Sequence, residues 1–131
     1  MNVLPALRSR QARVLVVDDE PVVLQLIWRM LEAGGHRVYL AADGVQAIAA
    51  LTEHAPIDVV VSDLRMPKLD GLSLSAMLAD RSPPVPVMLM SGYVADLSDV
   101  AADTPLLVKP FTENQLLAGV GRLLARAGQT A

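Results

Sequence analysis

Five short runs rich in apolar and β-branched residues recur along the 131-residue chain, and stretches with helical spacing separate them. These runs are Val14–Val17, Val38–Ala41, Val59–Ser62, Val87–Met90 and Leu106–Val108. A strand with one face in water alternates apolar and polar residues, whereas these runs are apolar almost throughout, as in parallel strands covered on both faces. The alternation of strand and helix therefore predicts an α/β fold, a doubly wound sandwich of three layers.

The helical stretches carry signals at their ends. Proline at a first helical position costs no hydrogen bond, and glycine tolerates a left-handed exit, so the first helix is predicted to begin at Pro21 and to end at the Gly34-Gly35 pair. Thr112, with Gln115 three residues later, is a capping-box pattern that starts the last helix. The predicted helices are 21–34, 44–54, 71–81 and 112–127.

Polar residues follow four of the five predicted strands. They are Asp18-Asp19-Glu20, Asp63, Ser91 and Lys109. In an open parallel sheet, ligands bind beyond the carboxyl ends of the strands, so these side chains are expected to meet at one rim. Several carboxylates on one rim repel each other unless a cation neutralises them, and Mg²⁺ suits such oxygen ligands. A lysine and a hydroxyl beside them are the groups that a phosphoryl group needs. The alternative is that these are ordinary loop and cap residues, but their recurrence at four strand ends favours a site.

Four strings carry a family resemblance when taken together. The strings VLVVDDEP, DVVVSDLRMPKLDG, VMLMSGY and LLVKPF occur in this order, and the chain from residue 13 to about residue 127 resembles the receiver domain of two-component response regulators. An acidic pair or a Lys-Pro step alone would carry no weight. The resemblance implies a flavodoxin-like sheet of order 2-1-3-4-5. We expect a stand-alone receiver at 13–127, with an N-terminal tail at 1–12 and a C-terminal tail at 128–131.

The resemblance also implies which residues hold a metal and accept a phosphoryl group. Asp63 matches the phosphoacceptor of the family and is also an implied metal ligand, and Asp18 and Asp19 match the metal-binding acidic pair. The backbone carbonyl of Arg65 matches a further metal ligand. The implied cofactor is Mg²⁺, which together with the lysine neutralises charge on the oxygens that are transferred.

Two more residues complete the implied site. Ser91 matches the switch hydroxyl, and Lys109 matches the lysine that holds the phosphoryl oxygens, with a cis bond to Pro110. The implied phosphoryl donor is a histidine kinase or a histidine phosphotransfer protein. We expect a switch that catalyses only its own phosphorylation and dephosphorylation, is not otherwise an enzyme, and signals to a protein target that the sequence does not name.

Composition excludes several other classes of function. The chain has no cysteine, which removes disulfides and thiolate chemistry, and its net charge of −3 argues against a nucleic-acid surface. Its apolar runs are far shorter than the ~20 residues that a membrane span needs. The first twelve residues lack the apolar core of a signal peptide. We therefore expect a cytoplasmic protein with no nucleic-acid or membrane partner.

Two alternative functions stay open. A phosphatase of the haloacid dehalogenase type also uses an aspartate after a parallel strand. Its first motif places a second Asp two residues after the nucleophile, whereas this chain has Glu20 there. This alternative also leaves Asp63 without a role. A receiver-like module that is never phosphorylated would work by constant binding. The presence of Asp63, Ser91 and Lys109 argues against that second alternative.

Helical spacing in the first helix suggests a docking surface. The predicted buried stripe consists of Val23, Leu26, Ile27, Met30 and Leu31. Leu24 and Trp28 would then lie together on an exposed flank and could meet the histidine donor, because aromatic anchors often dominate interfaces. The alternative is that Trp28 folds onto the domain's own surface. His36 and His54 are expected to face solvent near helix ends.

Further expectations concern the chain after Ser91. Only 17 residues separate Ser91 from Lys109, and residues 93–103 are rich in turn- and cap-forming types, so helix 4 of the fold is expected to be short or irregular. Leu106 stands where receivers commonly carry an aromatic switch residue. We therefore expect signalling by ordering of residues 93–105, and an influence of Arg65 and Tyr93 on the phosphoryl lifetime.

Overall fold

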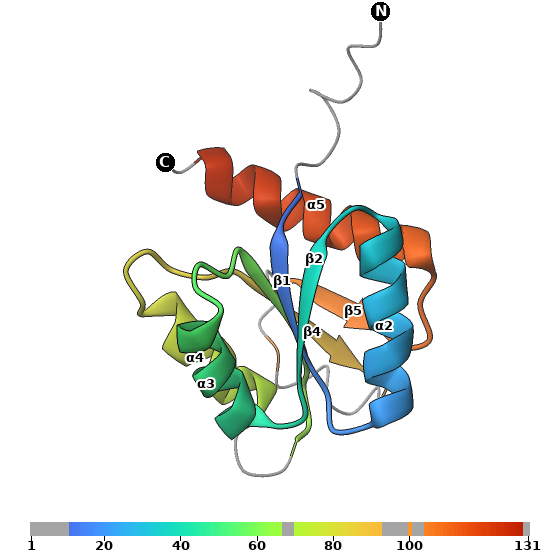
Figure 1. Ribbon diagram of the computed structural model, residues 1–131, viewed down its shortest axis with the longest axis horizontal. Helices are drawn as coiled ribbons and strands as arrows, with labels where there is room; N and C mark the ends of the chain where they lie inside the picture. The colour runs from blue at the N-terminus through green and yellow to red at the C-terminus, as the bar shows by residue number, and fades with distance from the viewer. Residues whose placement is uncertain (1–10, 67–69, 93–99, 101–103, 130–131) are drawn as a thin grey trace, which may run out of the picture.

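A computed structural model describes residues 11–66, 70–92, 100 and 104–129 of the chain. Strands and helices alternate along it as far as β4, which is followed among the described elements by β5 and then α5 (Figure 1). The elements are β1 (Arg13–Val17), α2 (Pro21–Ala33), β2 (Arg37–Ala41), α3 (Gly44–Glu53), β3 (Val59–Asp63), α4 (Gly71–Ala79), β4 (Val87–Ser91), β5 (Leu106–Val108) and α5 (Glu113–Gln129). Among these residues, no helix is both long enough and apolar enough to cross a bilayer.

The five strands form one parallel sheet of order β2-β1-β3-β4-β5, which confirms the predicted fold and strand order. Val14 of β1 pairs with Val38 of β2 on one side and with Val59 of β3 on the other. The helices α2 and α5 cover one face of the sheet, and α3 and α4 cover the other (Figure 1). The molecule therefore has the three layers that the alternating strands and helices predict.

Alternate residues of each strand pack into two separate cores. Val14 and Val16 of β1 contact the core beneath α2 and α5, whereas Leu15 and Val17 contact the core beneath α3 and α4. Successive side chains of a strand point to opposite faces, so both sets must be apolar when both faces are covered. This arrangement explains the apolar runs in the sequence.

Side-chain caps define the start of two helices. Asp70 Oδ1 accepts a hydrogen bond from the Ser73 amide at 2.8 Å and caps α4. The Thr112 amide donates to Gln115 Oε1 at 2.8 Å, and the Gln115 amide donates to Thr112 Oγ1 at 3.1 Å, so the predicted capping box of α5 is confirmed. The helix continues to Gln129, into the segment that was predicted to be a C-terminal tail.

The prediction for the exposed flank of α2 was wrong at Leu24. The buried residues of this helix are Leu24, Ile27 and Leu31. Leu26, predicted to be buried, is 52% exposed, and Trp28 is half-buried. Helical spacing indicates which residues of α2 lie on the same side of the helix. It does not indicate how the helix is rotated about its axis against β1 and β2, and this rotation decides which side is buried. Leu24 and Trp28 therefore do not form an exposed pair.

The prediction of a solvent-facing His36 was also wrong. The side chain is buried, and its Nδ1 accepts a hydrogen bond from the Ala12 amide at 3.1 Å. Ala12 itself is fully buried in the core beneath α2 and α5, although it was predicted to belong to a tail. His54 is half-buried, and its ring stacks on Tyr39 with the centroids 4.2 Å apart.

The expectation for a short or irregular helix 4 and for ordering of residues 93–105 falls almost entirely outside the described part of the chain. Val100 packs against the core beneath α3 and α4. Leu106 begins β5 and packs against the same core.

Candidate functional site

The carboxyl ends of the strands bring the predicted site residues together. The register pairs Val17 with Ser62 and Ser91 with Val108, so the residues that follow these strands reach one rim of the sheet. Lys109 Nζ lies 3.1 Å from Asp18 Oδ2 and 3.7 Å from Asp63 Oδ1. A cation therefore bridges two carboxylates that come from different strands.

Asp18 is held rigidly at the centre of this rim. Its side chain is fully buried, and its Oδ1 accepts a hydrogen bond from the Glu20 amide at 2.9 Å. Its Oδ2 accepts one from Lys109, and its backbone N–H donates to the Ala41 carbonyl at 3.1 Å. These contacts fix the carboxylate before any ligand arrives.

Three neighbouring carboxylates offer oxygen ligands for a cation. Those of Asp18, Asp19 and Glu20 lie within 4.8 Å of one another, and Asp19 and Glu20 are exposed. Carboxylates at this spacing, partly buried and partly open to water, match what Mg²⁺ takes from a protein.

Burial and like charge change the acidity of Asp63. Burial raises the pKa of its carboxyl to about 6, the charge of Asp18 adds to this rise, and the charge of Lys109 opposes it. A backbone hydrogen bond from Arg65 also opposes it. Because the carboxylates outnumber the single lysine, a further cation here would favour the ionised Asp63.

Lys109 stays charged in this environment. Burial alone would lower its pKa, but the charges of Asp18 and Asp63 outweigh burial and raise the pKa above its ordinary value. Its backbone N–H donates to the Ser91 carbonyl at 2.8 Å, which ties the end of β5 to the end of β4. The bond to Pro110 is cis, as the resemblance implied. Ser91 is buried beside it.

The start of α4 lies directly against Asp63. A Cβ atom built on Gly71 would clash with the carbonyl oxygen of Asp63, and the Gly71 amide donates to the Leu64 carbonyl at 3.0 Å. The sequence predicted only that a helix begins at residue 71, and Gly71 was assigned no part in the site. An Asp-Gly step at a helix start, shortly after a strand-end aspartate, is the signal that points to it. Gly71 is thus a positioning residue for Asp63.

Arg65 is exposed two residues after Asp63, whereas Tyr93 lies outside the described residues. The structure thus brings together Asp18, Asp63, Ser91 and Lys109 as predicted and places Asp19 at the edge of the same rim.

Comparison with known proteins decides between the interpretations of this rim. A family model described as the response regulator receiver domain matches residues 14–120. The chain belongs to this family. Receiver domains serve two-component signalling by phosphorylation. The phosphatase alternative fails, because its nucleophile would be Asp18, whose side chain is fully buried.

The most similar relatives that we compared are response regulators. Transcriptional regulatory protein PrrA of Mycobacterium tuberculosis is 42% identical across 91% of this chain, and response regulator MprA of Mycobacterium sp. strain KMS is 39% identical across 87% of it. The receiver spans about half the length of these relatives, 52% and 51%.

Solved structures show the same fold. A response regulator receiver domain protein from Clostridium thermocellum superposes with a TM-score of 0.83 at 29% identity, over 92% of this receiver and 99% of that chain. The chemotaxis response regulator CheY4 of Vibrio cholerae gives a TM-score of 0.75 at 30% identity, over 87% and 99% of the two chains.

Proposed function

We propose that this receiver accepts a phosphoryl group on Asp63 from a phosphohistidine donor, with Mg²⁺ as cofactor, and passes the signal on by protein–protein contact in the cytoplasm. The observation that carries the proposal is the contact of Lys109 Nζ with both Asp18 and Asp63 at the carboxyl rim. Of the two carboxylates, Asp18 is fully buried and Asp63 is only partly buried, so a donor can reach Asp63.

Phosphoryl transfer requires an oxygen of Asp63 to attack phosphorus in line with the bond that breaks. One Oδ–P bond forms, the P–N bond of the phosphohistidine breaks, and the nitrogen electron pair returns to the imidazole of the donor. Lys109 Nζ, already within 3.7 Å of Asp63 Oδ1, is placed to pair with an oxygen of the arriving group. The receiver supplies the nucleophile and fixed charges, and catalysis is limited to its own phosphorylation and dephosphorylation.

The donor set fits Mg²⁺. Asp18, Asp19 and the backbone carbonyl of Arg65 would hold the ion beside Asp63, with water completing its coordination. When bound, Mg²⁺ neutralises charge on the phosphoryl oxygens. Burial raises the pKa of Asp63 most and the charge of Asp18 adds to the rise, so a cation held beside it would favour the ionised carboxylate.

Ser91 and the surface of α2 complete the proposal. Buried at the end of β4, Ser91 is placed to donate a hydrogen bond to the phosphoryl group and so to report its arrival. On α2, Val22 is 79% exposed and Leu26 is 52% exposed, one turn apart near the rim. These two residues, and not Leu24, are the apolar contacts offered to a histidine kinase or histidine phosphotransfer protein, with the half-buried Trp28 at their edge.

The test is labelling with acetyl phosphate and Mg²⁺, followed by intact-mass analysis. We expect one phosphoryl group per chain on the wild type, none on Asp63→Asn, and none when EDTA removes the ion. Labelling of Asp63→Asn at the wild-type level would contradict the assignment. Absence of labelling in a folded wild-type protein, with phosphohistidine donors as well, would favour the module that works by constant binding.

A further inference from the structure

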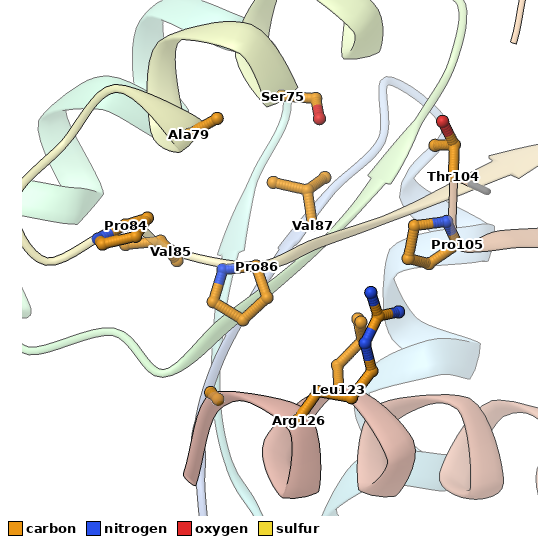
Figure 2. Close-up of a pocket in the computed structure, with 11 residues that line it drawn as sticks. Ser75, Ala79, Pro84, Val85, Pro86, Val87, Thr104, Pro105, Leu123 and Arg126 are labelled. Carbon is orange, nitrogen blue, oxygen red and sulfur yellow. The ribbon is translucent and has the colours of Figure 1, made fainter. Parts of the chain in front are cut away.

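A cavity of about 420 Å³ lies at the opposite end of β4 from Asp63 (Figure 2). The last turns of α4 and α5 bound it, together with the segments that lead into β4 and β5. Its volume is in the range of small-molecule sites, roughly 300–1,000 Å³. None of its lining residues belongs to the phosphorylation rim, so any ligand here would occupy a second site.

The inside of the cavity is apolar and partly rigid. Val87 of β4 and Leu123 of α5 line it and are buried. The rings of Pro86 and Pro105 line it as well. Proline fixes its own φ angle, so these parts of the wall are held in place before any ligand binds. An apolar group that enters this cavity leaves water, which is the main favourable contribution to binding in such sites.

A single charged side chain stands at the edge of the cavity. Arg126 is an exposed residue of α5, and Figure 2 shows its side chain reaching toward Pro105. It is the only charged residue in the lining, and it forms no ion pair within the described part of the chain. The hydroxyls of Ser75 and Thr104 are the other polar side-chain groups of the lining. The cavity therefore presents one uncompensated positive charge beside an apolar interior.

We propose that this cavity binds a small monocarboxylic acid with an apolar body. The body packs against Val87, Leu123 and the proline rings, and the carboxylate pairs with Arg126 at the edge that is open to water. A planar guanidinium group can donate two parallel hydrogen bonds to a carboxylate. The single cation matches a single negative charge, whereas a phosphate monoester carries nearly two. This inference stands independently of phosphorylation at Asp63.

The test is an NMR titration of the full ¹⁵N-labelled chain with sodium octanoate. We expect saturable shifts at the amides of Ser75, Ala79, Val85, Val87 and Arg126, all of which line the cavity. Hexanoate should bind about tenfold more weakly than octanoate, because it buries two fewer CH₂ groups. Octanamide, which has the same body without the charge, should bind about fivefold more weakly, as expected when an exposed ion pair is lost.

Two variants test the part played by the charge. Arg126→Gln should weaken octanoate binding by about fivefold and remove the difference between octanoate and octanamide. Arg122→Gln is the matched control, since Arg122 lies one turn earlier on α5 and does not line this cavity. It should leave the affinity for octanoate unchanged. Unchanged amide shifts far from residue 126 verify that each variant is folded.

Several outcomes would overturn the proposal. They are the absence of saturable shifts at tens of millimolar octanoate, equal affinity for octanoate and octanamide, and equal affinity for hexanoate and octanoate. Shifts at exposed apolar residues such as Val22 and Leu26 instead of at the cavity would indicate non-specific binding and would also contradict it. Shifts at the cavity on dilution of the protein alone would assign it to a second copy of the chain.

Discussion

At the scale of single residues, Asp63 depends on a neighbour that carries no side chain. Gly71 brings the first turn of α4 so close to Asp63 that a Cβ would meet its carbonyl oxygen, a backbone atom that cannot swing aside. Any larger residue must therefore displace either the start of α4 or the end of β3. The nucleophile moves with whichever segment gives way.

We expect Gly71→Ala to slow acetyl phosphate labelling of Asp63 by about tenfold or more, because small displacements of a nucleophile are costly in rate. Gly92→Ala is the matched control, since its Cβ would make only ordinary contact with Lys109 at 3.7 Å. The measurement is the labelling rate at saturating Mg²⁺. Equal rates for the two variants would show that α4 adjusts without moving Asp63.

His36 makes the stability of the receiver depend on pH. Burial lowers its pKa from the ordinary value of 6.5, and its Nδ1 can accept from the Ala12 amide only when unprotonated. The unfolded chain therefore binds the proton more readily than the folded one. The stabilisation is complete above 6.5 and is lost as the pH falls through 6.5 toward the lower folded pKa.

Urea unfolding between about pH 7.5 and about pH 5.5 measures this effect. Asp63, whose pKa is raised to about 6, gains stability over the same range as the pH falls, so the effect of His36 is the difference between two proteins. We expect the free energy of unfolding of the wild type to fall more, or rise less, than that of His36→Gln, which keeps an acceptor but does not titrate. His54→Gln should retain the pH dependence of the wild type. An identical slope for wild type and His36→Gln would rule out His36 as its source.

At the scale of elements, α2 has one apolar side that packs on the sheet and another that is exposed to water. Leu24, Ile27 and Leu31 face the sheet, whereas Val22 and Leu26 face water near the phosphorylation rim. The exposed side is the one available to a partner.

Substitutions on the two sides of α2 should separate its contribution to stability from its contribution to donor binding. We expect Leu24→Ala to lower the free energy of unfolding by about 3 kcal/mol, since it opens a cavity in the core. Leu26→Ala should change it by less than about 0.5 kcal/mol. Leu26→Ala should nevertheless slow transfer from whichever histidine kinase labels Asp63 fastest, and leave acetyl phosphate labelling unchanged. Slowing of both reactions by Leu26→Ala would indicate a structural role instead.

At the scale of the whole molecule, a cation held at the carboxylate rim, as proposed for Mg²⁺, would couple its binding to folding. Asp18 and Asp63 come from different strands and meet only when the sheet has formed, so the unfolded chain has no such site. A ligand that binds only the folded state stabilises it by mass action.

We expect Mg²⁺ at 100 times its dissociation constant to raise the free energy of unfolding by about 2.7 kcal/mol. Asp18→Asn should lose most of this increment, whatever its own starting stability, because a ligand charge is gone. The measurement is thermal or urea unfolding across a Mg²⁺ series, with NaCl of equal ionic strength as the control. An increment that survives in Asp18→Asn would place the ion elsewhere.

The sequence by itself determined the layers, the parallel strands and the polar residues of the rim. Apolar runs report burial on both faces, and Asp63, Ser91 and Lys109 share a rim because parallel strands end on one side. These properties follow from local order along the chain and from the resemblance, so no knowledge of packing was required to predict them.

The tertiary structure alone decided features that depend on how separate elements rotate and meet. Leu24 and Leu26 lie two positions apart and so on different sides of α2, and only the seating of α2 on the sheet decides which of the two is buried. His36 is buried because it meets Ala12 across 24 positions of the chain. A cavity at the end of β4 opposite Asp63 is lined by Pro105 and Arg126, which reach it from separate parts of the chain. Sequence spacing indicates which residues lie on the same face of a helix or strand, but it does not determine how that face is oriented against the elements packed next to it.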